Sequence, residues 1–127
     1  MLTLSASKEP FHLMLTGEKK YEFRKASKWI ESRLYHSTTG ERKHYTHVKF
    51  INGYGKQRPY VIFKFLGLLQ IHEINEKYST GLQILEKGGK FYCIKLGNLI
   101  KYDNLIKKDV DSFMEDKKNP KIHMYRF

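Results

Sequence analysis

The sequence predicts an α+β fold, a small β-barrel of five to six strands with two to three flanking helices. Three observations predict it. The chain has 127 residues, a length that suits one domain. Segments in which apolar and polar residues alternate, as they do in strands, outnumber segments with helical spacing. One short sheet cannot bury both of its faces, and curling it into a barrel with helices against its outside or its end solves that problem.

The N-terminal part predicts a strand followed by a short helix. Residues 2–6 alternate apolar and small polar side chains, which is typical of a strand. Ser7 suits the N-cap of a helix over residues 8–16, and Pro10 suits its first turn, where a missing N–H costs little. Gly17 ends this helix, because glycine adopts a left-handed C-cap cheaply.

A second strand and a second helix follow. Residues 19–25 alternate again, so that Tyr21 and Phe23 face one side of the predicted strand. Residues 26–35 place apolar side chains at helical spacing. A loop rich in serine and threonine then leads to Gly40.

The middle of the chain predicts two strands joined by a turn. Residues 45–51 form the first strand, and residues 52–55 form the turn, because two glycines there tolerate positive φ. Residues 60–74 are rich in β-branched and aromatic side chains and predict a long strand. Gly67 interrupts this strand and marks a bulge or a bend.

The C-terminal part predicts fewer regular elements. Residues 75–90 are polar and glycine-rich, so we expect a loop with room for one helical turn. Residues 91–96 predict a strand, and residues 100–102 continue the sheet. Residues 109–118 show helical spacing, and residues 120–127 suit one more strand.

Composition narrows the classes of function. The chain carries 24 Lys and Arg against 13 Asp and Glu, a net charge of +11, which points to a polyanionic partner. A single cysteine excludes an internal disulfide and a Cys-rich zinc site. No signal peptide and no apolar stretch of ~20 residues is present, so we expect a soluble, cytoplasmic protein with no membrane partner.

The excess positive charge is concentrated in residues 42–72, which hold six Lys or Arg and no carboxylate. The same segment is rich in aromatic residues. Cations attract phosphates and aromatic rings stack on bases, so this mixture favours single-stranded RNA or a nucleotide as partner. The alternative is a merely basic protein, since half of the aromatic rings of a strand point into its core. The candidate nucleic-acid-binding residues are Lys19, Lys20, Arg24, Arg42, Lys43, Lys49, Tyr54, Lys56 and Arg58.

The segment from Gly17 to Arg24 carries the most specific pattern. A short helix ends in glycine, lysine follows two residues later at Lys19, glutamate three further on at Glu22, and arginine two after that. This spacing resembles the ASCH domain family, which has a PUA-like fold. The resemblance covers roughly residues 1–102, and residues 103–127, a C-terminal extension of the single predicted domain, have no counterpart in it.

Softer matches resemble an ASCH subgroup common in phages, prophages and some bacterial genomes. They lie at residues 29–34, 52–59 and 92–97. The resemblance implies a barrel with helices at its rim and a cleft that bears Lys19, Glu22 and Arg24. It also implies RNA binding, which is generally proposed for ASCH domains, or membership of one of two enzymatic branches. One branch deacetylates acetylcytidine nucleoside and the other cleaves single-stranded RNA.

The three motif residues suit either binding or catalysis. Arginine grips a phosphate or a carbonyl with two parallel bonds, glutamate accepts from an exocyclic amine, and lysine supplies a point charge. A catalytic Lys19 needs a depressed pKa to act as base or nucleophile, with Glu22 positioning or protonating the reacting group. The alternative for Glu22 and Arg24 is an intramolecular ion pair that holds the cleft.

The acetylcytidine branch differs from this chain at one position, because it has threonine where this chain has Glu22. A hydroxyl donor is thereby replaced by a charged acceptor. That branch also uses a distant glutamate, for which the sequence offers three candidates. They are Glu73, Glu76 and Glu86.

Other potential sites are weaker. His44 and His47 have no neighbouring cysteine or carboxylate, so no metal site is predicted. No glycine pattern for a phosphate loop or a dinucleotide is present, so no cofactor is predicted. Cys93 has no charged activator beside it and suits a buried, inert thiol. Trp29 suits a core or rim anchor, or a stacking platform if it faces solvent.

Three functions therefore follow from the sequence. The first is an RNA- or nucleotide-binding protein with a Lys/Glu/Arg cleft and a basic face. The second is a hydrolase, an amidohydrolase or a ribonuclease, that works through Lys19 on modified nucleosides or single-stranded RNA. The third is a phage-type adaptor that binds an acidic host protein.

Overall fold

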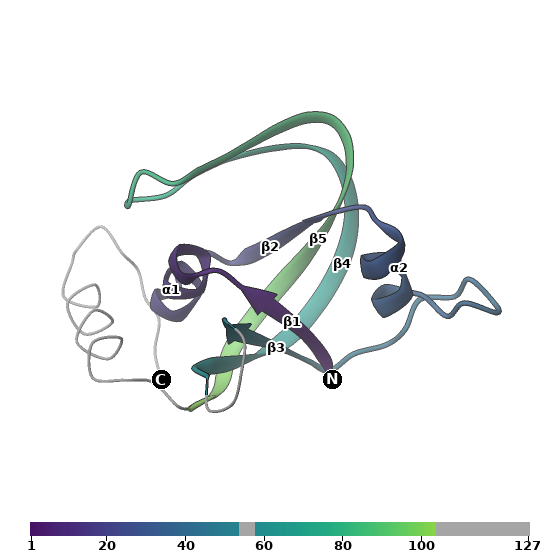
Figure 1. The fold of residues 1–127 in the computed structure, drawn as a ribbon, viewed down its shortest axis with the longest axis horizontal. Coiled ribbons are helices and arrows are strands. Elements are labelled where there is room, and N and C mark those ends of the chain that lie inside the picture. Colours follow the sequence, from purple (N-terminus) through teal and green to yellow (C-terminus); the bar gives the residue numbers. More distant parts are fainter. Residues whose placement is uncertain (54–57, 104–127) are drawn as a thin grey trace.

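The computed structural model describes residues 1–53 and 58–103 and confirms the α+β class. Five strands form one mixed sheet in the order β1-β3-β4-β5-β2, with two helices (Figure 1). The elements are β1 (Leu2–Ala6), α1 (Lys8–Thr16), β2 (Tyr21–Lys25), α2 (Lys28–Leu34), β3 (His47–Asn52), β4 (Tyr60–Lys77) and β5 (Gln83–Asp103). The predicted Tyr54 and Lys56, and the helix and strand expected after residue 108, lie outside the described residues.

The sheet is open between its two edge strands. β1 pairs in parallel with β3, and the remaining neighbours are antiparallel. Within the described residues no ladder joins β1 to β2, so the sheet is not closed into a barrel. One side chain bridges the gap, because the Arg24 guanidinium on β2 donates to the Ser5 carbonyl on β1.

The core lies between one face of this curved sheet and the two helices. Alternation decides which side chains enter it, since β1 buries every second residue and β3 buries Val48 and Phe50. α1 adds Phe11, Met14 and Leu15, which recur at helical spacing. α2 adds Ile30 and Leu34, so both helices are held by their apolar faces.

The prediction of a loop over residues 75–90 is wrong. β4 continues to Lys77 and β5 starts at Gln83, so most of this segment is a two-stranded arm. Figure 1 shows the arm rising from the sheet and curling back over β2 towards α1. The arm is polar because it leaves the core, and a polar strand pair that contains glycines has the same local composition as a loop.

Gly81 lies in the turn at the tip of the arm, as a loop glycine would, whereas Gly88 and Gly89 lie inside β5. Ile71 pairs with Phe91 and Glu73 pairs with Lys87, so one residue of β4 faces three of β5. Gly88 lies inside this bulge with a φ of 85°. The glycine therefore bends a strand rather than ending it. Gly67 does mark a register shift, as predicted.

Boundaries differ by a few residues elsewhere. β2 starts at Tyr21 rather than at Lys19. α2 begins at Lys28, and Ser27 is its N-cap, with a hydroxyl that accepts a hydrogen bond from Ile30 N at 3.2 Å. β5 runs through residues 97–103, which confirms that residues 100–102 continue the sheet. No helix in the described part of the chain is long and apolar enough to cross a membrane.

Candidate functional site

Lys19, Glu22 and Arg24 converge at the start of edge strand β2, and we call these three residues the charge cluster. The Glu22 carboxylate is its centre, with Oε1 3.2 Å from Lys19 Nζ and Oε2 accepting from Arg24 Nη2 at 2.8 Å and Nε at 3.2 Å. The Phe23 backbone N–H also donates to Oε1 at 3.2 Å. The ion pair between Glu22 and Arg24, which the sequence offers as the alternative to ligand binding, is present, and Lys19 extends it to three groups.

The helix end before the motif places Lys19 in this cluster. Gly17 ends α1 with a φ of 88°, and Lys19 N then donates to Leu13 O at 3.0 Å, which ties the turn to the helix. Leu96 N donates to Lys20 O at 3.0 Å, which starts the pairing of β2 with β5. The left-handed Gly17 and these hydrogen bonds of Lys19 and Lys20 thus fix the direction in which the Lys19 side chain leaves the backbone.

The Lys19 side chain is fully buried, with 0% of it exposed. Its ammonium donates to Tyr21 O and lies 4.8 Å from the centre of the Phe23 ring and 5.7 Å from that of Tyr78. Burial lowers the pKa of Lys19, and the negative charge of Glu22 opposes that shift. Lys19 is therefore paired inside the protein, and its ammonium has no contact with solvent, whereas the Arg24 side chain is still 23% exposed.

The tip of the β4–β5 arm closes this site, which the sequence did not predict. Tyr78 is buried there, and Ser79 donates to the Glu18 carboxylate twice, from its backbone N at 2.6 Å and its hydroxyl at 2.7 Å. We call the Glu18–Ser79 contact the latch. No local pattern reveals it, because Glu18 and Ser79 lie in two connecting segments that are 61 residues apart in the chain.

Of the three candidate glutamates, Glu76 is the one whose charge acts on the cluster. It opposes the lowering of the Lys19 pKa, and it adds to burial in raising the pKa of the Tyr78 phenol. Glu73 and Glu86 are exposed on the arm. Cys93 is buried and burial raises the pKa of its thiol, which agrees with the prediction of an inert cysteine.

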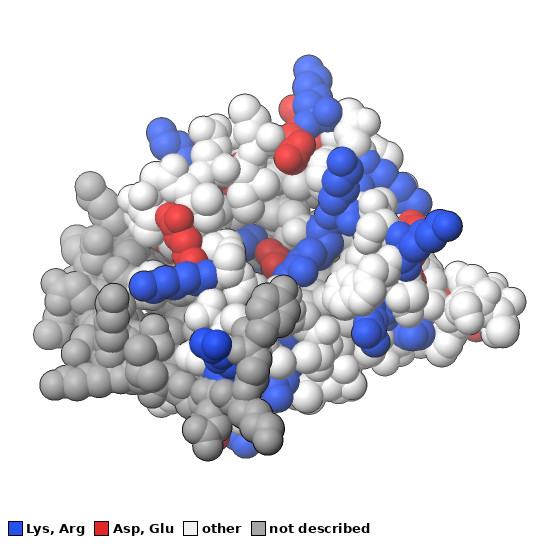
Figure 2. Space-filling view, viewed as in Figure 1, with Lys and Arg blue, Asp and Glu red and all other residues white. Residues whose placement is uncertain are grey.

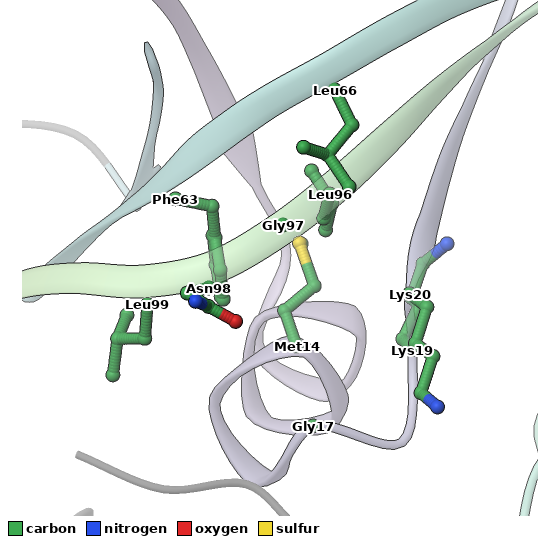
Figure 3. A pocket seen from close by; sticks show the side chains of 10 residues that line it. All are labelled: Met14, Gly17, Lys19, Lys20, Phe63, Leu66, Leu96, Gly97, Asn98 and Leu99. Atoms are coloured by element: carbon green, nitrogen blue, oxygen red, sulfur yellow. The ribbon is translucent and has the colours of Figure 1, made fainter.

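A pocket of about 700 Å³ lies beside the charge cluster, between the end of α1 and strands β4 and β5 (Figure 3). Apolar side chains make up much of its wall, and Lys20 and Asn98 add polar groups. Lys19 belongs to the wall, whereas Glu22 and Arg24 do not. Its lining residues are Met14, Gly17, Lys19, Lys20, Phe63, Leu66, Leu96, Gly97, Asn98 and Leu99.

A row of cations lies on the outward face of the sheet. Lys49 projects away from the core, between buried Val48 and Phe50, and its Nζ lies 4.2 Å from the centre of the Tyr60 ring. Lys64 on β4 pairs with His47, and Lys101 on β5 pairs with Ile62, which itself pairs with Lys49. We call Lys49, Lys64 and Lys101 the outer basic face. Strand pairing, rather than proximity in sequence, adds Lys101 to it.

The other predicted binding residues do not join this face. Lys43 Nζ donates to Ser32 O at 2.9 Å on α2, and Arg42 donates to Leu68 O on β4. Arg58 lies against Gly53, in the connection between β3 and β4. Figure 2 accordingly shows Lys and Arg spread over the visible surface, with carboxylates beside several of them. The described Lys and Arg residues that the sequence predicts for one basic surface therefore lie in several separate places.

Comparisons with known proteins add no family. No family model, no curated protein and no solved structure matches this chain. Within the described residues no group of three or more His, Cys, Asp or Glu side chains is arranged to hold a metal ion.

Proposed function

We propose that this protein binds single-stranded RNA or a nucleotide, as a module of the ASCH type with a PUA-like, barrel-related fold. The observation that carries the proposal is the outer basic face. Lys64 and Lys101 are exposed, and no ion pair within residues 1–53 and 58–103 occupies them. Cations left without carboxylate partners are available to phosphates, and Tyr60 beside Lys49 adds an aromatic ring.

The pocket supports the nucleotide part of the proposal. Its volume of about 700 Å³ falls in the range of small-molecule sites, and its wall is partly apolar, as a base requires. Lys20 is exposed at its rim and suits a phosphate. Figure 3 shows the Asn98 side chain extending towards Met14, where its amide offers both a donor and an acceptor.

In this proposal the charge cluster supports the site instead of contacting RNA. The Lys19 ammonium is buried against Glu22, and the Arg24 guanidinium spans the gap between the sheet edges. That bridge also supports the PUA-like assignment, because it links the two strands that a barrel would have to join. Contacts with phosphate then fall to Lys20 and to the outer basic face.

The test is the salt dependence of RNA binding, measured by the fluorescence anisotropy of a labelled oligouridylate. For single strands the logarithm of affinity falls with that of salt concentration by ~0.7 per phosphate contact. Replacing Lys49, Lys64 and Lys101 with alanine should therefore reduce the slope by about 2. The matched control replaces Lys8, Lys77 and Lys87, which are exposed elsewhere. No binding at low salt, or equal slopes for both triple variants, would contradict the proposal.

A hydrolase that works through Lys19 is the second candidate. The observation in its favour is a buried lysine of lowered pKa beside Glu22 and within the field of Glu76. Such an enzyme must open the latch to admit a substrate. The test is product formation from acetylcytidine and from RNA, compared between the wild-type protein and a folded Lys19→Met variant. Equal amounts of product from the wild-type protein and the Lys19→Met variant would rule this candidate out.

A further inference from the structure

Helix α2 presents the only tryptophan of the chain to solvent. Trp29 is 50% exposed, while Ile30 and Leu34 on the same helix are buried in the core. The Arg33 guanidinium lies one helical turn further, with its carbon 5.2 Å from the centre of the Trp29 ring. The indole is therefore not a core anchor, and it is paired with a cation through its ring.

The helix that carries Trp29 is held from several directions. Ser27 caps its first turn, and Glu31 accepts from the Tyr92 hydroxyl and from Lys90 on β5. At its other end the Tyr45 hydroxyl donates to Arg33 O. A short helix bound at both ends fixes the backbone from which Trp29 projects, so binding of a ligand need not order that segment.

The charges around Trp29 favour an anionic ligand. Lys28, which precedes Trp29 in α2, and Lys25, at the end of β2, are exposed, and Lys43 is held against Ser32 of the same helix. The carboxylate of Glu31 is already engaged by Tyr92 and Lys90, whose hydrogen bonds lower its pKa. Arg33 disfavours a cationic ligand at the ring, so a neutral aromatic group flanked by negative charge fits best.

We propose that Trp29 and Arg33 form a stacking platform for one unpaired base of single-stranded RNA, with Lys28 and Lys43 next to the flanking phosphates. The platform is separate from the pocket, since α1 and α2 lie at opposite ends of β2 (Figure 1). It rests on the proposed function, because it takes RNA as the ligand. It adds a second contact point and predicts that the bases, and not only the phosphates, matter for binding.

The test uses the emission of Trp29 itself. Because it is the only tryptophan, its fluorescence reports on this site in the unmodified protein. We expect unlabelled oligouridylate to quench the emission over the concentration range in which anisotropy shows binding. An abasic oligonucleotide of equal length and charge should bind without that quenching. Removal of one stacked base costs about 10-fold in affinity, so Trp29→Ala should weaken RNA binding by that factor and leave abasic binding unchanged.

The controls separate this proposal from the function on which it rests. Leu85→Ala removes another large exposed side chain, on the arm, and should bind RNA like the wild type. If RNA binds by anisotropy while Trp29 emission stays constant, or if the abasic oligonucleotide quenches equally, the platform is wrong and the RNA-binding function stands. If neither signal responds to RNA, both proposals fail. The emission experiment uses the wild-type protein, so it tests the platform even if the Trp29→Ala variant does not fold.

Discussion

The charge cluster on β2 and the outer basic face are both built around lysines, but their surroundings differ completely. Lys19 is fully buried and paired with Glu22, whose second oxygen holds Arg24. Lys64 and Lys101 are exposed at the surface of the sheet. A buried ammonium needs a partner to offset desolvation, whereas an exposed one is already solvated by water. The first arrangement serves the structure of the site, and the second leaves charge free for a ligand.

Because of this difference, not every positive charge in the net charge of +11 is available to a ligand. The sequence motif predicts Lys19 and Arg24 as binding residues. In the structure their donors are directed to Glu22, to Tyr21 O and to Ser5 O.

The largest effect is expected from Glu22→Gln. The variant keeps the shape of the side chain but leaves two cations without their counter-charge, and one of them is buried. Breaking a buried pair from one side costs about 3–5 kcal/mol. Urea unfolding should show a loss of this size, while the control Glu73→Gln, at an exposed position on β4, should change little. Equal losses for the two variants would show that the cluster does not stabilise the fold.

The second prediction concerns pH. Burial lowers the pKa of Lys19 below its ordinary 10.5, so between the lowered value and 10.5 the unfolded chain holds a proton that the folded one has released. Stability from this group therefore rises with pH in that window, by at most about 1.4 kcal/mol per pH unit.

The measurement is the difference in unfolding free energy between wild type and Lys19→Met at several alkaline pH values. Burial raises the pKa of Tyr78, which has the opposite effect at high pH, but that contribution is present in both proteins. The difference should grow in favour of the wild type as pH rises. A constant difference would mean that Lys19 titrates alike in both states.

The local part of the site was predictable from the sequence, and the long-range part was not. Gly17, Lys19, Glu22 and Arg24 lie within one turn and one strand, so short-range geometry brings them together. Alternation placed β1, β2 and β3 for the same reason. The latch, Tyr78 and Lys101 depend on how strands pair across the chain, which periodicity does not encode. Gly88 was misplaced because a glycine in a bulge has the same local signature as a glycine in a turn.

The third prediction tests the latch. Glu18→Ala removes both acceptors of Ser79 and should free the tip of the arm. We expect a loss of about 1 kcal/mol, as for hydrogen bonds that remain partly accessible to water. Mass spectrometry should find Lys19 more reactive towards an amine-specific reagent, while the reactivity of exposed Lys101 stays the same. Unchanged protection of Lys19 would show that other contacts keep the site closed.

The smallest change in stability is expected for the outer basic face. Replacing Lys49, Lys64 or Lys101 singly with alanine should alter the unfolding free energy by no more than about 0.5 kcal/mol, because surface substitutions rarely exceed that amount. Thermal unfolding provides the measurement. A much larger loss would mean that the outer basic face also has a structural role, and RNA-binding data from the triple variant would then need a folded-state control.

The strand order has a consequence for the speed of folding. β4 and β5 are neighbours in sequence and zip from a tight turn, which is the fast kind of contact. β1 must find β3, and β2 must find β5, across long stretches of chain, as in the pairs Leu2 with Val48 and Phe23 with Cys93. Long loop closures are slower. We therefore expect β2, which carries Glu22 and Arg24, to pair with β5 after the β4–β5 arm has formed. Lys19 then becomes buried in the same step in which it meets Glu22.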